Sequence, residues 1–310
     1  MKKVLIPTKL DKVVKQILEE KGFTVVQDKD TPLADLAKAN ADASVVIVRS
    51  EKVPAEIIDL LPALKLVVRA GAGFDNIDTK YARTKNVDVM NTPGANSNAV
   101  AEEVVAMILT AYRKLVPADI STRAGKWEKS KFMGRELTGK TLGILGLGHI
   151  GRLLAKRVSG FEVKVLAFDP FVSAEAAASM GVTLSTVEEI FSQADIISLH
   201  IPENDSTRGM VNEKLLALIK PGAMIVNCAR AGIVDEDALR KAKAEKELIY
   251  CNDVYKKDAE GEKSIADVAD VMAPHLGANT YEANFVAARR AAEQTVEYFE
   301  NGNTSCVVNK

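Results

Sequence analysis

Three glycines in one short stretch have the spacing of a phosphate-binding turn. Gly146, Gly148 and Gly151 follow an apolar run and precede a segment whose apolar residues recur at helical spacing. The first glycine would allow a tight turn, the second would let the backbone approach a pyrophosphate, and the third would permit close packing of helix and strand. The helix N-terminus would offer N–H groups to the phosphates. His149 and Ile150, inside the motif, are expected to contact the same ligand.

An acidic residue follows at the distance typical of a dinucleotide site. The apolar run at residues 163–168 ends at Asp169, about 20 residues beyond the glycines. A carboxylate there can accept hydrogen bonds from both hydroxyls of a ribose and repels a 2′-phosphate. Glycines alone could mark a purely structural turn, but strand, glycines, helix, second strand and acid occur here in order. The sequence therefore predicts a Rossmann-type unit that binds NAD rather than NADP.

The elements that must position these residues recur along the whole chain. Strands are expected at residues 3–7, 23–26, 44–48, 65–68, 140–145, 163–168, 195–199, 223–227, 248–251 and 271–273. Helices are expected at residues 12–21, 97–115 and 280–299, with a short extended segment at 305–308. Continuous apolar strands joined by helices imply parallel sheets covered on both faces. The predicted class is α/β, with two doubly wound parallel sheets.

Length and composition exclude several other classes. A chain of 310 residues is long enough for two domains. The 41 Lys and Arg nearly balance the 42 Asp and Glu, which disfavours nucleic acid as a partner. The apolar runs are far shorter than the roughly 20 residues of a membrane helix, and the first one stops at Pro7, too early for a signal peptide.

Cys228, Cys251 and Cys306 are widely spaced, which favours a reducing compartment, by default the cytoplasm. The histidines lack the spacing of a metal site, so no metal is expected.

Several stretches resemble the signatures of NAD-dependent D-2-hydroxyacid dehydrogenases. Residues 227–236, Asn-Cys-Ala-Arg-Ala-Gly-Ile-Val-Asp-Glu, resemble the first signature, and residues 274–277, Pro-His-Leu-Gly, resemble the second. Residues 69–78 and 90–94 also fit the family. The resemblance covers nearly the whole chain, and the motifs together are highly specific.

The resemblance implies two domains, one inserted into the other. A flavodoxin-like substrate-binding domain would comprise residues 1–98 and 283–310, and a Rossmann-type NAD-binding domain would comprise residues 99–282. The active site would lie in the cleft between them. The resemblance also implies a homodimer formed through the NAD-binding domain, with Trp127 near the dimer arm.

The family's chemistry assigns roles to three residues of this chain. His275 would be the base that takes the proton of the C2 hydroxyl, because the ordinary pKa of histidine lies near neutrality. Arg230 would bind the substrate carboxylate bidentately, which a lysine could not do. The family's third residue, a Glu that hydrogen-bonds the histidine, is replaced here by Asp258, with Glu260 or Glu262 as alternatives. The shorter Asp side chain requires a closer loop or gives a weaker pair.

Further contacts are expected from other strand ends and from the matching motifs. Cofactor contacts are expected from His200, Pro202, Cys228, Ala229, Asp253 and Gly277. Substrate contacts are expected from Arg49, Ser50, Arg69, Gly71, Gly73, Asn98 and Lys131. The cations Arg49, Arg69 and Lys131 favour a phosphorylated substrate, although a charge at a strand end is most often simply solvated. Cys228 has no base paired with it, so we interpret it as a small buried residue.

Within the family, residues 125–137 most resemble the branch that oxidises D-3-phosphoglycerate to 3-phosphohydroxypyruvate, the first step of phosphorylated serine synthesis. The chain ends at Lys310, so we expect neither the C-terminal regulatory domain of longer members nor feedback control by serine through it. A glyoxylate or hydroxypyruvate reductase, or a D-lactate-type dehydrogenase, is the alternative on the same scaffold. A binding protein that senses NAD(H) is the alternative of another class.

Overall fold

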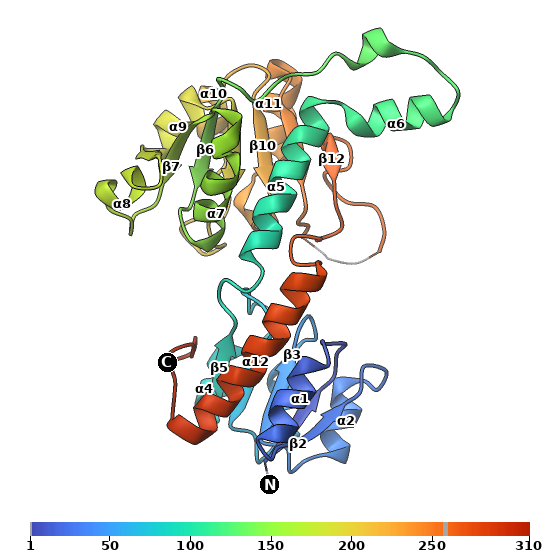
Figure 1. Ribbon diagram of the computed structural model, residues 1–310, viewed down its shortest axis with the longest axis vertical. Helices are drawn as coiled ribbons and strands as arrows, with labels where there is room; N and C mark the ends of the chain where they lie inside the picture. The colour runs from blue at the N-terminus through green and yellow to red at the C-terminus, as the bar shows by residue number, and fades with distance from the viewer. Residues whose placement is uncertain (1, 257–259) are drawn as a thin grey trace. The chain divides into compact units, whose positions relative to one another are not determined.

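The computed structural model describes residues 2–256 and 260–310, which form two compact units (Figure 1). Unit 1 combines the residues up to Asn96 with Ala278–Lys310, and unit 2 is Ser97–Gly277. Each unit is a parallel sheet with helices on both faces. The predicted α/β class with two doubly wound sheets is confirmed.

Unit 1 has a five-stranded parallel sheet in the order β2-β1-β3-β4-β5, the flavodoxin-like order. Its strands are β1 (Lys3–Ile6), β2 (Thr24–Gln27), β3 (Val45–Val48), β4 (Leu66–Arg69) and β5 (Asp88–Asn91). Its helices are α1 (Val13–Glu20), α2 (Leu33–Ala39), α3 (Ala55–Asp59), α4 (Thr79–Thr84) and α12 (Tyr281–Asn301). Helices α1 and α12 cover one face of the sheet, and α2, α3 and α4 cover the other. Every residue of β3 is buried because it lies between two apolar layers.

Unit 2 has a seven-stranded parallel sheet in the order β12-β11-β10-β9-β6-β7-β8. Its strands are β6 (Thr141–Leu145), β7 (Lys164–Phe168), β8 (Val182–Leu184), β9 (Ile196–Leu199), β10 (Met224–Asn227), β11 (Ile249–Asn252) and β12 (Val271–Met272). Its α-helices are α5 (Ser97–Tyr112), α6 (Leu115–Arg123), α7 (His149–Val158), α8 (Ala174–Ala178), α9 (Val187–Gln193), α10 (Glu213–Leu218) and α11 (Glu236–Lys246). Single 3-10 turns are η1 (Lys129–Phe132), η2 (Ser159–Phe161) and η3 (Ala231–Ile233). The strand order reverses between β6 and β9, as in other dinucleotide-binding sheets.

The structure corrects the expected helix at residues 97–115. Helix α5 ends at Tyr112, Lys114 takes a left-handed backbone with φ 51°, and α6 begins at Leu115. Pro117 explains the break, because in a continuous helix its ring would clash with the carbonyl of Arg113. In the first turn of a new helix the proline is tolerated.

The structure has two edge strands that the sequence does not predict, and one predicted extended segment that is reduced to a single bridge. β5 begins with Asp88 and ends with Asn91, and β8 has the exposed Thr183 at its centre, so neither strand forms a continuous apolar run. At residues 305–308, where a short extended segment is expected, the structure has a turn at Ser305 and Cys306 and a single antiparallel bridge between Val307 and Met90. None of the described helices is long and apolar enough to cross a membrane.

Candidate active site

Six strands of unit 2 end together along one edge of its sheet. Their pairing aligns the last residues in a single row: Phe168, Leu145, Leu199, Asn227, Asn252 and Met272. In parallel α/β sheets, ligands bind where the carboxyl ends of the strands meet. The loops that follow this row carry the glycine motif, Asp169, His200, Arg230, Asp253 and His275. The structure therefore brings these cofactor-binding and catalytic candidates to one sheet edge.

The glycine turn is shaped by backbone contacts that leave no room for side chains at two positions. Gly146 has φ 97°, and a Cβ there would lie 2.7 Å from the carbonyl oxygen of His200. A Cβ at Gly151 would overlap the carbonyl of Gly146. At Gly148 nothing lies within 4 Å of an added Cβ, so this side of the turn is open to a ligand. The geometry agrees with the roles that the spacing predicts.

Asp169 holds the glycine turn from the neighbouring strand end. Its Oδ2 accepts the N–H of Leu147 at 2.8 Å, and its Oδ1 accepts the N–H of Phe171 at 2.9 Å. Each carboxylate oxygen retains capacity for a further donor, such as a ribose hydroxyl. Helix α7 begins beside this turn with Gly148 as N-cap, and no side chain caps it. The open turn, the uncapped helix and the carboxylate together fit a dinucleotide.

His200 presents a neutral ring beside the same turn. Its Nε2 hydrogen-bonds with Ser198 Oγ at 2.8 Å, while its Nδ1 is buried without a hydrogen-bond partner among the described residues. Burial lowers the pKa of His200 to about 4, so the ring stays uncharged at neutral pH. A buried polar atom without a partner is costly in the absence of a ligand or water.

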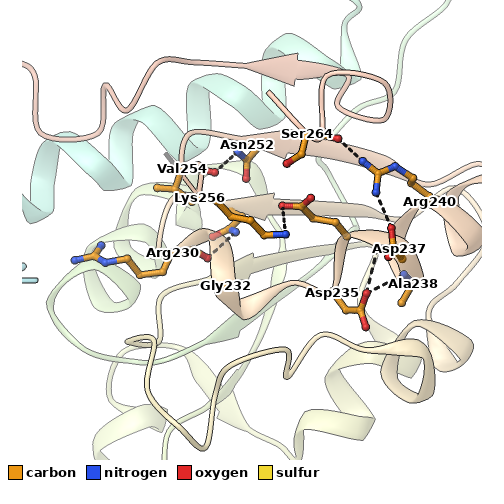
Figure 2. Close-up of polar contacts among 12 residues, drawn as sticks. Arg230, Gly232, Asp235, Asp237, Ala238, Arg240, Asn252, Val254, Lys256 and Ser264 are labelled. Carbon is orange, nitrogen blue, oxygen red and sulfur yellow. Dashed lines mark hydrogen bonds and ion pairs between the residues drawn. The ribbon is translucent and has the colours of Figure 1, made fainter. Parts of the chain in front are cut away.

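Arg230 is carried by a loop that Asn227 fixes from within the sheet. The Asn227 side chain is fully buried; its Oδ1 accepts the N–H of Ala229 and its Nδ2 donates to the carbonyl of Arg230. Figure 2 shows the Arg230 side chain extending away from the polar residues around the start of α11. There Asp235 caps α11 by accepting the N–H groups of Asp237 and Ala238. The loop backbone is thus anchored, and Nη1 of the half-buried Arg230 donates to the carbonyl of Ala229 at 2.7 Å.

His275 sits on the loop after β12 in an unusual backbone conformation. Its φ is 56°, in the left-handed region that non-glycine residues seldom occupy, and its side chain is exposed. The next two residues anchor it: Leu276 and Gly277 donate their N–H groups to Asp253 at 2.7 and 3.0 Å. Asp258, the predicted partner of His275, lies outside the described residues. The alternatives Glu260 and Glu262 are exposed.

A buried acidic cluster lies behind this loop, and the sequence analysis did not single out one of its members. Glu103 of α5 faces Asp253, and their carboxyl oxygens and the sulfur of Cys228 all lie within 4.8 Å of one another. The helical period could have identified Glu103, because it lies four residues from the buried Ala99 and four from the buried Met107. Burial raises the pKa of the Cys228 thiol well above its ordinary value, so it is no ready nucleophile.

The remaining cofactor candidates of unit 2 differ in exposure. Ala229 and Gly277 are buried, whereas Pro202 is exposed and its carbonyl accepts a hydrogen bond from Thr207 Oγ1. His149 is also exposed, at the start of α7. Ala229 and Gly277 could therefore contact a ligand through their backbone N–H and C=O groups.

The substrate candidates of unit 1 gather at the ends of β3 and β4. Arg49 is half-buried and donates from Nη2 to the carbonyl of Ala278 at 3.0 Å; burial lowers its pKa, an effect that nearby Glu51 opposes. The guanidinium of Arg69 lies over Gly71, where a Cβ would overlap it. Ser50 is exposed and Gly73 is half-buried. The structure brings both arginines to one edge of this sheet, because Val48 and Arg69 are paired in register.

Asn98 and Lys131, the two other substrate candidates, belong to unit 2. Asn98 is exposed near the start of α5, where it donates to Glu102 Oε1 at 2.8 Å and accepts from Arg157. Lys131 lies in η1 and pairs with Glu128 Oε1 at 2.6 Å. Its ammonium therefore has a carboxylate partner within its own segment, which weakens the argument for a phosphate contact.

The chain is similar to known proteins in sequence and in structure. A family model described as the NAD-binding domain of D-isomer specific 2-hydroxyacid dehydrogenases matches residues 105–277. The structure of NAD⁺-bound 3-phosphoglycerate dehydrogenase of Entamoeba histolytica is similar with a TM-score of 0.84 and 34% identity, over 100% of this chain and 99% of that one. These matches confirm the predicted family and NAD as its cofactor.

Two curated relatives extend the comparison. The chain is 40% identical to human D-3-phosphoglycerate dehydrogenase over 312 residues, which cover 100% of this chain and 58% of the human protein. It is 38% identical to the D-3-phosphoglycerate dehydrogenase of Archaeoglobus fulgidus over 298 residues, 95% of this chain and 56% of that protein. The chain thus spans less than two thirds of the length of these relatives. It belongs to the family of NAD-dependent, D-isomer specific 2-hydroxyacid dehydrogenases.

Proposed function

We propose that the protein oxidises D-3-phosphoglycerate at C2 to 3-phosphohydroxypyruvate, reversibly and with NAD, as the first step of phosphorylated serine synthesis. The observation that carries this proposal is the similarity to 3-phosphoglycerate dehydrogenases along the whole chain, including a solved structure of nearly the same length. The common edge that carries the glycine turn, Arg230 and His275 supports the same chemistry.

Each proposed catalytic residue performs one task at a stated atom. When bound, NAD accepts the hydride that leaves C2. His275 takes the proton of the C2 hydroxyl, so that the carbonyl can form, and returns it in the reverse direction. Arg230 binds the carboxylate with two parallel N–H bonds and draws electron density from the C2 oxygen. We retain Asp258 as the proposed partner that orients His275.

The proposed binding residues fall into groups that would contact different parts of the cofactor and the substrate. Asp169 would accept hydrogen bonds from the adenosine ribose, and the N–H groups at the start of α7 would bind the pyrophosphate. Arg49 and Arg69 would bind the phosphate of the substrate, since guanidinium groups match phosphate oxygens in geometry and charge. Asn98 and the backbone at Gly71 and Gly73 would add neutral donors.

The test is NADH oxidation with 3-phosphohydroxypyruvate beside hydroxypyruvate, glyoxylate and pyruvate, each over a full concentration range. We expect kcat/KM to be highest for the phosphorylated acid, and Arg69→Gln to remove that preference while sparing hydroxypyruvate. Equal or better rates with unphosphorylated acids would identify a general reductase on the same scaffold. No turnover with any of them, together with tight NADH binding, would favour a sensing role.

We also infer that two copies associate through unit 2. Residues 115–133, which Figure 1 shows extending from the sheet of this unit, expose several large apolar side chains. The exposed fractions are 53% for Leu115, 64% for Ile120, 88% for Trp127 and 80% for Met133. Such a surface favours a partner of the same kind, as the family resemblance implies. We assign the protein to the cytoplasm, because its three cysteines are free thiols.

A further inference from the structure

Two carboxyl groups lie together behind the loop that carries His275. Glu103 projects from α5 and Asp253 follows β11, with the Cys228 sulfur beside them. Asp253 is 1% exposed and Cys228 is 9% exposed. Glu103 Oε2 is buried and receives no hydrogen bond from any of the described residues. The group that faces it is another carboxyl, which cannot donate while it is ionised.

Glu103 and Asp253 can lie side by side if their two carboxyl groups share a single proton. Two adjacent carboxylates in a buried setting are not both ionised near neutral pH. Burial, reinforced by the charge of Asp253, raises the pKa of Glu103 to about 8. Burial also raises the pKa of Asp253, but the N–H groups of Leu276 and Gly277 and the nearby His275 oppose that rise. The proton therefore resides on Glu103, which can donate it toward Asp253, and the pair carries one negative charge.

The charge on Asp253 acts directly on the catalytic loop. Its two oxygens accept the consecutive N–H groups of Leu276 and Gly277, the residues that follow the left-handed backbone of His275. Gly277 also packs against the pair, since a Cβ there would lie 3.0 Å from Glu103 Oε2 and 3.3 Å from Asp253 Oδ2. A change in the charge or spacing of the two carboxyl groups would therefore move the backbone that aims His275.

We propose that Glu103 is a positioning residue of the dehydrogenase, which shares a proton with Asp253 and thereby holds the His275 loop in its active conformation. The inference rests on the proposed function, because it takes His275 as the catalytic base. It assigns no substrate contact to Glu103. The alternative hypothesis is that the same atoms of Glu103, Asp253 and Cys228 bind a metal ion.

Among the residues that the structure describes, few other charged groups lie near Glu103 and Asp253. On α5 itself, Glu102 is exposed and pairs with Arg157 of α7. From the β10 loop, Cys228 contributes a neutral thiol, because burial raises its pKa. From the β12 loop, His275 interacts electrostatically with Asp253. Glu103 is thus the group whose titration would change the charge behind the loop near pH 8.

The sign of the pH effect follows from the raised pKa of Glu103. Above about pH 8 a second negative charge appears, the carboxylates repel each other, and the N–H bonds to Leu276 and Gly277 weaken. We expect kcat to fall on this alkaline side. Between pH 4.5 and about 8 the native state binds more protons than the unfolded state, so the free energy of unfolding should decline as pH rises. Glu103→Gln should abolish both effects, because an amide donates a hydrogen bond at every pH.

The first experiment needs neither substrate nor cofactor. Infrared difference spectra of the full chain, titrated from pH 6 to 10, should show a protonated carboxyl band that disappears near pH 8 and is missing in Glu103→Gln. Hydrogen exchange of the Leu276 and Gly277 amides, corrected for intrinsic rates, should lose protection over the same range only in the wild type. Glu245→Gln, the same change at an exposed position of α11, is the matched control.

The second experiment measures turnover in the same variants. Glu103→Leu, which removes the donor, should lower kcat on the order of tenfold to a hundredfold, and Glu103→Gln should restore it and lack the alkaline fall. An alkaline fall that persists in Glu103→Gln, the absence of the carboxyl band, or one equivalent of zinc bound by the wild type and lost in Glu103→Gln would overturn the proposal. If the band and the protection behave as expected but no hydroxy acid is turned over, the proposed function fails and the proton sharing stands.

Discussion

At the residue scale, the backbone of His275 determines which substitution can test its chemistry. A φ of 56° is strained for most residues, whereas asparagine tolerates the left-handed region well. Alanine would therefore combine the loss of the imidazole with a change of the loop. Asparagine separates the two effects, because it keeps the backbone and removes the imidazole that would take the proton.

We expect His275→Asn to lower kcat by about 10²- to 10⁴-fold, the range for a positioned proton transfer. The dissociation constant of NADH, measured by fluorescence titration, should stay unchanged because the glycine turn and Asp169 are untouched. The thermal midpoint should also stay close to that of the wild type. Near-normal turnover would remove His275 from the role of base.

Residue-level prediction from the sequence succeeded where a motif fixed both identity and place. Gly146, Gly148 and Gly151 form the expected turn, and Asp169 lies beside it, because a strand, a tight turn and a helix leave few alternatives. The signatures identified Arg230 and His275 as residues of interest. Glu103 belongs to no motif, and its importance depends on a residue 150 positions away in the chain, Asp253. Such pairings depend on tertiary structure and are invisible in a local pattern.

At the element scale, the contact between α7 and β6 explains why the third glycine of the motif matters. Gly151 lies where the helix passes the carbonyl of Gly146, and any side chain would overlap that carbonyl. The helix would have to move outward, which would carry its N-terminal N–H groups away from the turn. Helix α7 must therefore lie close to β6 if its N-terminal N–H groups are to bind a pyrophosphate.

Gly151→Ala should accordingly weaken NADH binding at least tenfold and lower the free energy of unfolding by about 1–3 kcal/mol, the usual cost of overpacking. Gly160→Ala is the control, because no atom lies within 4 Å of a Cβ at that position. Fluorescence titration and thermal unfolding of both variants give the comparison. Equal NADH affinity in the two variants would contradict the expected geometry.

The order of elements along the chain was predictable, but the ends of several elements were not. Apolar runs identified ten strands, because a strand buried on both faces has few polar residues. β5 and β8 were not predicted, since polar residues interrupt both: Asp88 and Asn91 in β5 and Thr183 in β8. The break between α5 and α6 could have been inferred from Pro117, because its ring would clash with the carbonyl of Arg113 in a continuous helix.

At the scale of the whole molecule, the exposed apolar segment of unit 2 predicts the oligomeric state. Light scattering of the purified chain should give twice the mass of one copy. Ile120→Glu places a charge in the middle of this segment and should shift the equilibrium toward the monomer. Leu218→Glu, at a 43% exposed leucine of α10, is the matched control and should leave the mass unchanged. A monomeric wild type at micromolar concentration would refute the inferred association.

Unit 1 is built from two separate segments of the chain, and this affects its folding during synthesis on the ribosome. The first 96 residues build its sheet, but α12 covers one face of that sheet with fully buried residues such as Ala288, Ala291 and Ala292. This helix leaves the ribosome only after all of unit 2 has been translated. The part of this apolar face that α12 covers must therefore stay exposed while about 180 further residues are added at roughly 5–20 residues per second. During that interval of many seconds the nascent chain is a natural substrate for chaperones, whereas unit 2, which is continuous in sequence, can fold as soon as it has emerged.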